Sequence, residues 1–257
     1  MERPASVKIA GDSALVVEFG NEISESISNR VRAMQAVLEH EKLQGITELV
    51  PTYRSLMVHY DPRTLTYQQM SAHLHEAITK MEDLVLPSPK IIEIPTLYGG
   101  EAGPDLANVA RHNGLEEEEV IRLHSGRDYL IYMLGFTPGF PYLGGMDSRI
   151  ATPRLENPRT KIKGGSVGIA GSQTGIYSID SPGGWQIIGW TPVPLFDPGV
   201  EQPFLLKAGN YLRFIPVSTE ESTRIQQLVE SREYHCNTHR YHDVYKNESV
   251  RGGGHSE

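Results

Sequence analysis

The stretch from residue 135 to residue 216 constrains the fold of this chain more than any other part of the sequence. It consists of short runs of β-forming residues, and Gly or Pro interrupts each run after a few positions. Gly and Pro destabilise helix interiors, so these runs do not suit helices. Many short strands joined by Gly- and Pro-rich turns are typical of a β-barrel. We therefore predict an all-β, closed or nearly closed barrel in this part of the chain.

The N-terminal part has a different pattern, in which strands alternate with helices. VKIA and ALVVEF around the turn residues GD predict a hairpin over 6–19, and ITELVPTYRSLMVHYDP predicts two further strands. Helical spacing predicts helices over 23–40 and 66–82, the first capped by Ser24. Their predicted apolar faces are Ile27, Val31, Met34, Val37 and Leu38, and Met70, Leu74, Ala77, Ile78 and Met81. This order predicts a small α+β, ferredoxin-like domain.

The domain boundary is predicted at LPSPK (86–90), where two prolines stand close together. The chain then divides into an α+β domain at 1–87, a barrel domain at 88–232 and a polar, mobile tail at 233–257. The strand pattern at 90–97 either returns to the first sheet or begins the barrel. Short helices are predicted at 105–112 and 116–123, a strand at 128–136, and a last helix capped by Ser218 or Thr219.

Charge and cysteine content exclude several classes of protein. The formal net charge of −8 argues against a nucleic-acid partner, which favours a basic surface. Cys236 is the one cysteine, so the chain forms no internal disulfide and suits a reducing compartment. The sequence shows neither an apolar leader at its start nor an apolar run long enough for a membrane span. These features predict a cytoplasmic location.

Two motifs have a chemical and a structural interpretation, and the structural one is favoured. GGSVG (164–168) matches a nucleophile elbow, but a β-like, Gly-broken segment follows it where the elbow requires a helix. Ser166 is therefore assigned to a strand and turn. HCNTHRYH in the tail spaces His235, Cys236 and His239 as zinc ligands could be spaced, although a polar terminal segment is more often mobile. We predict no metal site.

Two other segments are candidates for a binding site. PRLENPRTKIKGG concentrates cations beside a Gly-rich loop, and such a segment is either an anion site or a solvated hairpin. GFTPGFPYLGG (135–145) places aromatic residues among turn residues. This loop either plugs the end of a barrel or forms the aromatic wall of a pocket. The residue pattern alone leaves both choices open.

Long motifs carry a family resemblance, most specifically from 129 to 197: YGGEAGPDLANVA, LHSGRDYLIYMLGFTPGFPYLGGMD, PRLENPR, GSVGIAGSQTGIYSIDSPGGWQIIGWTP and LFDP. Together they resemble the family of B subunits of prokaryotic ATP-dependent 5-oxoprolinase. That family also includes Kip-type inhibitors of sporulation histidine kinases and allophanate hydrolase subunit 1. The resemblance extends over about 6–232 and implies a cyclophilin-like barrel after the α+β domain.

The resemblance also implies a reaction and partners. Together with a C-type oxoprolinase subunit, such a protein uses ATP, with Mg²⁺, to phosphorylate the lactam of 5-oxoproline, and an A-type oxoprolinase subunit helps ring opening to glutamate. The implied catalytic residues are Arg154, Arg159, Gln173 and Thr174. The implied substrate-binding residues are Phe136, Pro138, Phe140, Tyr142, Tyr177, Ser181 and Trp185. The implied phosphate-binding residues are Lys161, Lys163, Gly165 and Ser166. His124 and Asp180 are candidates for a general base, and each also suits a structural role.

This chain departs from the family pattern at two places. Lys163 and Gly164 stand where the family usually has Pro and Ala, and Trp190 stands where it usually has Arg. The lost cation at 190 could change the substrate, and Lys163 could replace it if its side chain points inward. The alternative function is inhibition of the autophosphorylation of a sensor histidine kinase, and a role in urea or allophanate metabolism is a third possibility.

Overall fold

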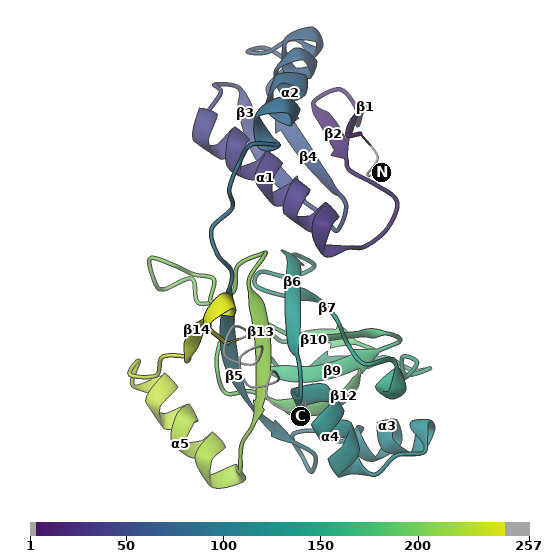
Figure 1. Ribbon diagram of the computed structural model, residues 1–257. Coiled ribbons are helices and arrows are strands. Elements are labelled where there is room, and N and C mark those ends of the chain that lie inside the picture. The colour runs from purple at the N-terminus through teal and green to yellow at the C-terminus, as the bar shows by residue number, and fades with distance from the viewer. Residues whose placement is uncertain (1–3, 245–257) are drawn as a thin grey trace, which may run out of the picture. The chain divides into compact units, whose positions relative to one another are not determined.

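The computed structural model describes residues 4–244 and divides into two compact units, Met1–Pro87 and Ser88–Glu257. Figure 1 shows the elements of each unit. The elements of the first unit are β1 (Ser6–Ile9), β2 (Ala14–Glu18), α1 (Glu25–Glu41), β3 (Ile46–Pro51), β4 (Ser55–Tyr60) and α2 (Tyr67–Met81). Its antiparallel sheet has the order β1-β2-β4-β3, so β4 lies between the two strands that α1 connects. This is the predicted split β-α-β arrangement.

Capping and burial explain the two helices of this unit. The Ser24 hydroxyl accepts a hydrogen bond from the Ile27 N–H, as predicted, and Thr66 forms a capping box with Gln69. The predicted apolar face of α1 is buried throughout, and that of α2 is buried except for Ile78, which is partly buried. Both helices pack with the sheet around one apolar core.

The second unit contains the barrel. Its strands are β5 (Lys90–Tyr98), β6 (Asp128–Leu134), β7 (Pro141–Gly144), β8 (Arg159–Ile162), β9 (Ser166–Ala170), β10 (Gln173–Ile176), β11 (Ser181–Gly183), β12 (Gln186–Trp190), β13 (Tyr211–Pro216) and β14 (Thr238–Arg240). Its helices are α3 (Leu106–Asn113), α4 (Glu117–Ser125), the short 3-10 helix η1 (Ser148–Ile150) and α5 (Thr219–Glu230).

The main sheet has the order β10-β9-β12-β5-β13-β6-β7, and its two end strands, β7 and β10, contact each other. The predicted nearly closed barrel is therefore confirmed. The strand at 90–97 begins the barrel as β5, which resolves the alternative left by the sequence. Because β5 and β13 run parallel, the sheet is mixed, and helices accompany it in this unit.

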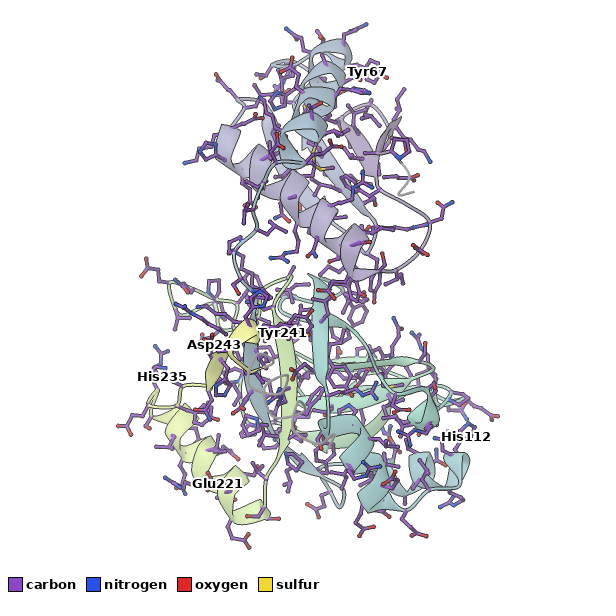
Figure 2. The ribbon with its side chains drawn as sticks, viewed as in Figure 1. Tyr67, His112, Glu221, His235, Tyr241 and Asp243 are labelled. Atoms are coloured by element: carbon purple, nitrogen blue, oxygen red, sulfur yellow. The ribbon has the colours of Figure 1, made fainter. Side chains whose placement is uncertain are left out.

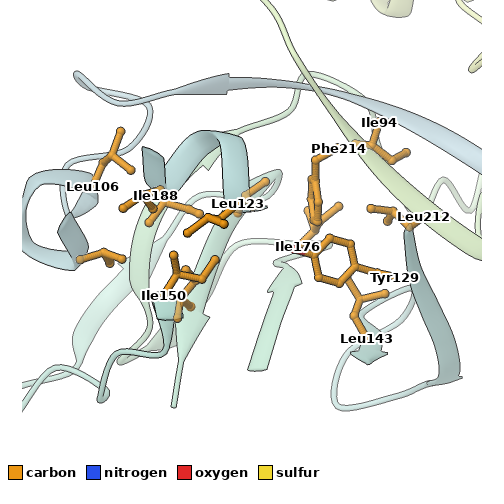
Figure 3. Packing of buried hydrophobic residues seen from close by; sticks show 14 of the residues in the cluster. Ile94, Leu106, Leu123, Tyr129, Leu143, Ile150, Ile176, Ile188, Leu212 and Phe214 are labelled. Atoms are coloured by element: carbon orange, nitrogen blue, oxygen red, sulfur yellow. The ribbon is translucent and has the colours of Figure 1, made fainter. Parts of the chain in front are cut away.

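The core of this unit fills the barrel with aliphatic and aromatic side chains (Figure 3). Tyr129 and Phe214 are fully buried and meet edge to face, with ring centroids 5.4 Å apart. The helices contribute Leu106 from α3 and Leu123 from α4. The barrel is thus a packed interior, and binding sites must lie at its rim and outer surfaces.

The described residues of the predicted mobile tail differ from that expectation. Strand β14 pairs antiparallel with the first half of β5, on the edge that β12 leaves unpaired. Tyr241 stacks on Tyr211 with ring centroids 4.3 Å apart (Tyr241 is labelled in Figure 2). The open edge of β5 offers backbone N–H and C=O groups to which β14 bonds. A prediction based on the polarity of the segment alone does not include such an edge. The rest of the tail, 245–257, lies outside the described residues.

Candidate functional site

Two cavities of the barrel unit contain most of the residues that the sequence singled out. We call the first the aromatic pocket; it has a volume of about 160 Å³ and is lined by Phe136, Phe140, Tyr142, Arg154, Gln173, Tyr177, Pro182, Gly183, Gly184 and Trp185. We call the second the cationic cavity; it has a volume of about 400 Å³ and is lined by Leu97, Glu101, Ala102, Pro104, Arg159, Lys161, Ile162, Lys163, Ser166, Ile187 and Trp190.

The two cavities share a wall. Ile162 and Ile187, which line the cationic cavity, pack in one cluster with Tyr177 and Trp185, which line the aromatic pocket. The two-stranded sheet of β8 and β11 contributes to both sides, since Arg159 lies at the start of β8 and Gly183 pairs with it from β11. Ligands in the two cavities therefore contact different side chains of one packed cluster.

Phe140 is the centre of the aromatic pocket. Its ring is almost fully buried and meets the rings of Tyr142 and Trp185 edge to face, with centroids 5.4 and 5.7 Å away. It also meets Tyr177 at 6.0 Å and Phe136 at 5.5 Å. Edge-to-face pairs hold rings in fixed relative orientations. The pocket wall is therefore preorganised.

The loop before β7 presents Phe136 at the mouth of this pocket. The Thr137 N–H donates to the Gly135 carbonyl at 2.7 Å, which closes a three-residue turn centred on Phe136. Phe136 has φ 62°, a left-handed conformation that costs a non-glycine residue about 1–2 kcal/mol. Its side chain is nevertheless 69% exposed. Backbone strain that displays an apolar ring to solvent is typical of a functional position. Of the two interpretations of this loop, the structure favours the pocket wall.

Polar groups in the aromatic pocket are few. Arg154 is exposed and forms neither a hydrogen bond nor an ion pair with the residues that the structure describes. Burial raises the pKa of the Tyr177 phenol, so this hydroxyl remains a hydrogen-bond donor at neutral pH. The pocket thus combines aromatic walls, an available guanidinium and a neutral donor.

Charge dominates the cationic cavity, where three basic residues and one carboxylate, Glu101, form part of the lining. Lys161 is paired with Asp180 at 3.0 Å, and both side chains are largely exposed. Lys163 forms no ion pair among the described residues, although its charge helps to lower the pKa of the Asp180 carboxyl, and its Nζ lies 4.1 Å above the centre of the Trp190 ring. The two departures from the family pattern, Lys163 and Trp190, therefore contact each other.

The Gly-rich loop at 164–166 does not present free backbone donors. The N–H of Gly164 donates to Asp180, that of Gly165 to the Tyr177 carbonyl, and that of Ser166 to the Lys163 carbonyl. A Cβ at Gly165 would lie 2.3 Å from the Thr191 carbonyl oxygen, and its φ is +87°. The glycine is therefore explained by packing. The phosphate-binding role expected for Gly165 has no geometric support here.

Arg159 lies in the cationic cavity, apart from Arg154. Its Nη2 donates to Asp105 Oδ1 at 2.8 Å, and the other oxygen of Asp105 accepts from the Ile187 N–H at 2.6 Å. Arg159 thus connects β8 through Asp105 to β12, which gives it a structural task beside any role in binding. No sequence pattern points to Asp105, because its partners are distant along the chain.

Thr174 lies in the interior and lines neither cavity. Its hydroxyl donates to the Gly168 carbonyl at 3.0 Å and accepts from His124 Nε2 at 2.7 Å, while His124 Nδ1 accepts from the Tyr98 hydroxyl at 2.7 Å. Burial lowers the pKa of His124 to about 3. The imidazole therefore stays neutral and fully bonded, so it has the structural role rather than that of a general base.

Other expected residues are placed as follows. Gln173 lines the aromatic pocket, whereas Pro138 and Ser181 are not among its lining residues. Asp180 binds Lys161 and the Gly164 N–H, and the latter bond is the main cause that lowers the pKa of its carboxyl. Pro182 and Gly183 line the pocket although the sequence assigned them no site role; their Pro-Gly turn chemistry is a usable signal.

The possible zinc ligands of the tail have other partners. His239 Nε2 bonds to Glu93 at 3.0 Å, and Cys236 packs against the barrel core, where burial raises the pKa of its thiol to about 12. A protonated thiol is a poor metal ligand. In the part of the chain that the structure describes, no group of His, Cys, Asp and Glu is arranged to hold a metal ion. Between residues 4 and 244, no helix combines the length and apolar character of a membrane span.

Comparisons with known proteins agree with this architecture. The family described as "Carboxyltransferase domain, subdomain C and D" matches residues 5–206. The B subunit of 5-oxoprolinase from Bacillus subtilis (strain 168) is 44% identical over 221 residues, which cover 82% of this chain and 92% of that protein. PH0987 of Pyrococcus horikoshii is 49% identical with a TM-score of 0.50, covering 84% of this chain and 99% of that one. TTHA0988 is 36% identical with a TM-score of 0.71, covering 80% of this chain and 40% of that one.

The matched domain and the barrel define the class, which is that of proteins built on carboxyltransferase subdomains C and D. Within this class, the chain belongs to the family of 5-oxoprolinase B subunits. The resemblance drawn from the motifs is thereby confirmed.

Proposed function

We propose that this chain is the B subunit of an ATP-dependent 5-oxoprolinase and that its aromatic pocket binds 5-oxoproline. Transfer of the terminal phosphoryl group of ATP to the lactam oxygen would make that oxygen a leaving group. Water then attacks the adjacent carbon, and the ring C–N bond breaks as the nitrogen takes up a proton, which leaves the acyl phosphate of glutamate. A second water displaces the phosphate and gives glutamate. The observation that carries this proposal is an unpaired Arg154 guanidinium at the edge of a small aromatic pocket.

The size and chemistry of the pocket suit a small cyclic carboxylate. Its volume of about 160 Å³ is below the roughly 300–1,000 Å³ of sites for drug-sized ligands. The ring of 5-oxoproline packs against the aromatic wall that Phe140 and Trp185 form, and the Arg154 fork binds its carboxylate in two hydrogen bonds. The amide of Gln173 and the phenol of Tyr177 are the groups that orient the lactam.

ATP with Mg²⁺ would be accommodated in the cationic cavity, whose volume of about 400 Å³ lies within that range. Arg159, Lys161 and Lys163 supply positive charge there. Glu101 is the type of ligand that Mg²⁺ accepts, because this ion usually binds one or two carboxylates together with nucleotide phosphates and water. For the transfer to occur, the terminal phosphoryl group and the lactam oxygen must meet at the edge of the shared wall.

A B-type protein works with other subunits of its enzyme. TTHA0988 supports this proposal, because the region that matches the present chain makes up only 40% of that longer chain. We propose that a C-type partner supplies the remaining contacts to ATP and lactam and that an A-type partner helps ring opening. A partner would also supply the general base, because His124 is buried with both ring nitrogens hydrogen-bonded and Asp180 is paired with Lys161.

The first experiment measures ATP hydrolysis that depends on 5-oxoproline. The chain is assayed alone and then co-purified with the C-type and A-type partner proteins encoded in the same genome. We expect glutamate formation only in the assembled set. A stable complex without turnover would overturn the proposal. Inhibition of a sensor histidine kinase, through the exposed ring of Phe136 and its loop, would then be the function to test.

A further inference from the structure

The cationic cavity holds a lysine whose ammonium group contacts an aromatic ring and forms no ion pair with the residues that the structure describes. Lys163 Nζ lies 4.1 Å above the Trp190 ring, and the Trp190 Nε1–H donates to the Gly164 carbonyl at 2.9 Å. This hydrogen bond holds the indole next to the backbone of Gly164, the residue that follows Lys163. A cation–π contact attracts the ammonium group but leaves its N–H donors available, unlike a salt bridge.

A second polar group in the same cavity is also available. Ser166 is only 6% exposed and lines the cavity, yet its hydroxyl forms no hydrogen bond with any residue that the structure describes. The Ser166 hydroxyl oxygen is not one of the fully buried oxygens that lack a partner, so it is open to the cavity and a ligand there can reach it. Lys163 and Ser166 are close in the chain, because the Ser166 N–H donates to the Lys163 carbonyl at 3.1 Å.

Lys161 provides the contrast. It lies on β8, two residues before Lys163, and lines the same cavity, but Asp180 pairs with it at 3.0 Å. Its side chain is 74% exposed, so water already solvates its charge. An anion that binds Lys161 must compete with the Asp180 carboxylate and with water. The two lysines therefore differ, because Lys161 forms an ion pair with Asp180 whereas Lys163 contacts an indole ring.

We infer that Lys163, held by Trp190, and the Ser166 hydroxyl bind a phosphoryl group, and that Lys161 and the backbone amides of 164–166 do not. Trp190 is a positioning residue, because its ring holds the Lys163 ammonium group in place where a carboxylate would otherwise do so. Arg159 shares its guanidinium with Asp105 and closes the other side of the cavity. The identification of the phosphoryl group with that of ATP rests on the proposed function, whereas the existence of the anion site does not.

The test compares two substitutions that each remove one positive charge, at Lys161 and at Lys163, two residues apart in the chain. Affinity for inorganic triphosphate and for a non-hydrolysable ATP analogue is measured by calorimetry, with the full chain alone and in complex with the C-type partner. We expect Lys163→Gln to weaken binding about tenfold or more, because a charge-assisted hydrogen bond is lost. Ser166→Ala should weaken it severalfold, and Lys161→Gln should change it less than twofold. Equal losses for both lysine variants would show a general charge effect and overturn the assignment.

The two tryptophans of the chain give a second readout, since Trp185 lies in the aromatic pocket and Trp190 in the cationic cavity. The chain is labelled with 5-fluorotryptophan and assembled with the unlabelled C-type partner. Trp185→Phe and Trp190→Phe assign the two fluorine resonances. Triphosphate and the ATP analogue should shift the Trp190 resonance, and 5-oxoproline the Trp185 resonance. A triphosphate that shifts only Trp185, or neither resonance while it binds, would overturn the inference.

The outcomes separate this inference from the proposed function. Binding of the ATP analogue but not of triphosphate would show that the base or ribose, and not a phosphoryl group, is recognised, which sinks the inference. Triphosphate binding that depends on Lys163, in a complex without 5-oxoproline-dependent turnover, would sustain the anion site and remove the oxoprolinase assignment. Turnover that is unchanged in Lys163→Gln would remove the anion site and leave the oxoprolinase assignment in place.

Discussion

The aromatic pocket and the cationic cavity lie on either side of the cluster of Ile162, Tyr177, Trp185 and Ile187, but they are built on different principles. The aromatic pocket fixes its geometry by ring–ring contacts around Phe140 and contains one unpaired charge. The cationic cavity fixes its geometry by ion pairs and by one lysine supported on an indole. A site for a neutral ring and a site for an anion can therefore share a wall without sharing a recognition mechanism.

Substitution of Arg154 should have the largest effect that distinguishes the aromatic pocket from the cationic cavity. Arg154→Ala in the assembled complex should lower 5-oxoproline-dependent kcat/KM at least about a hundredfold, because a bidentate charged contact to the substrate is lost. Arg154→Lys should be intermediate, since a lysine keeps the charge but not the fork. The thermal midpoint should stay unchanged, because Arg154 has no hydrogen bond or ion pair within residues 4–244 to lose. An active Arg154→Ala complex would remove this residue from the site.

Arg159 should show the opposite profile. Arg159→Ala should reduce the free energy of unfolding of the chain by about 2 kcal/mol, because Asp105 then keeps a buried carboxylate oxygen without its charged partner. Urea unfolding of this variant is compared with that of Arg154→Ala, the matched arginine without such a bond. Undiminished stability together with lost activity would show that Arg159 acts in the site and not as a connection between β8 and β12.

The pH dependence of stability tests the buried hydrogen bonds of His124 to Tyr98 and Thr174. Its folded-state pKa of about 3 lies below the roughly 6.5 of an unfolded histidine. Its contribution is therefore complete above pH 6.5 and is lost progressively as the pH falls toward 3. Between pH 7 and pH 5.5 the wild-type chain should lose about 1 kcal/mol of unfolding free energy that His124→Gln does not lose. Parallel pH profiles for the two proteins would contradict a neutral His124 that is bonded to Tyr98 and Thr174.

The sequence predicts a feature well when residues close together along the chain determine it, and poorly when residues far apart along the chain do. The helix faces of the first unit are local, and Ser24 and the residues spaced from Ile27 to Leu38 behave as predicted. The barrel follows from the density of short strands. The pairing of β14 with β5 is not local, because it depends on an edge that β12 leaves open. A polarity pattern therefore suggests a tail where the chain forms a strand.

The same reasoning applies to the site. Aromatic and cationic segments are visible in the sequence, but their separation into two cavities requires the positions of β8, β11 and β12. The sequence places Arg154 and Arg159 together, whereas in the structure they line different cavities and Arg159 pairs with Asp105, although both charges act on the Tyr177 phenol. Thr174 follows Gln173 directly, yet strand alternation turns one toward the pocket and the other toward His124. Proximity in sequence is thus a poor guide to shared chemistry within short strands.

Two adjacent glycines of the aromatic pocket give the finest test of the comparison. A Cβ at Gly183 would lie 2.2 Å from the Tyr177 hydroxyl and 2.9 Å from Ile162, so Gly183→Ala must displace the phenol that orients the lactam. A Cβ at Gly184 would lie 3.5 Å from its nearest neighbour, Pro158, which is an ordinary contact. We expect Gly183→Ala to raise the KM for 5-oxoproline about three- to fivefold and to leave triphosphate affinity unchanged, while Gly184→Ala changes neither. If Gly183→Ala instead impaired triphosphate binding, the shared wall would transmit displacement from one cavity to the other, and the two sites would have to be treated as one.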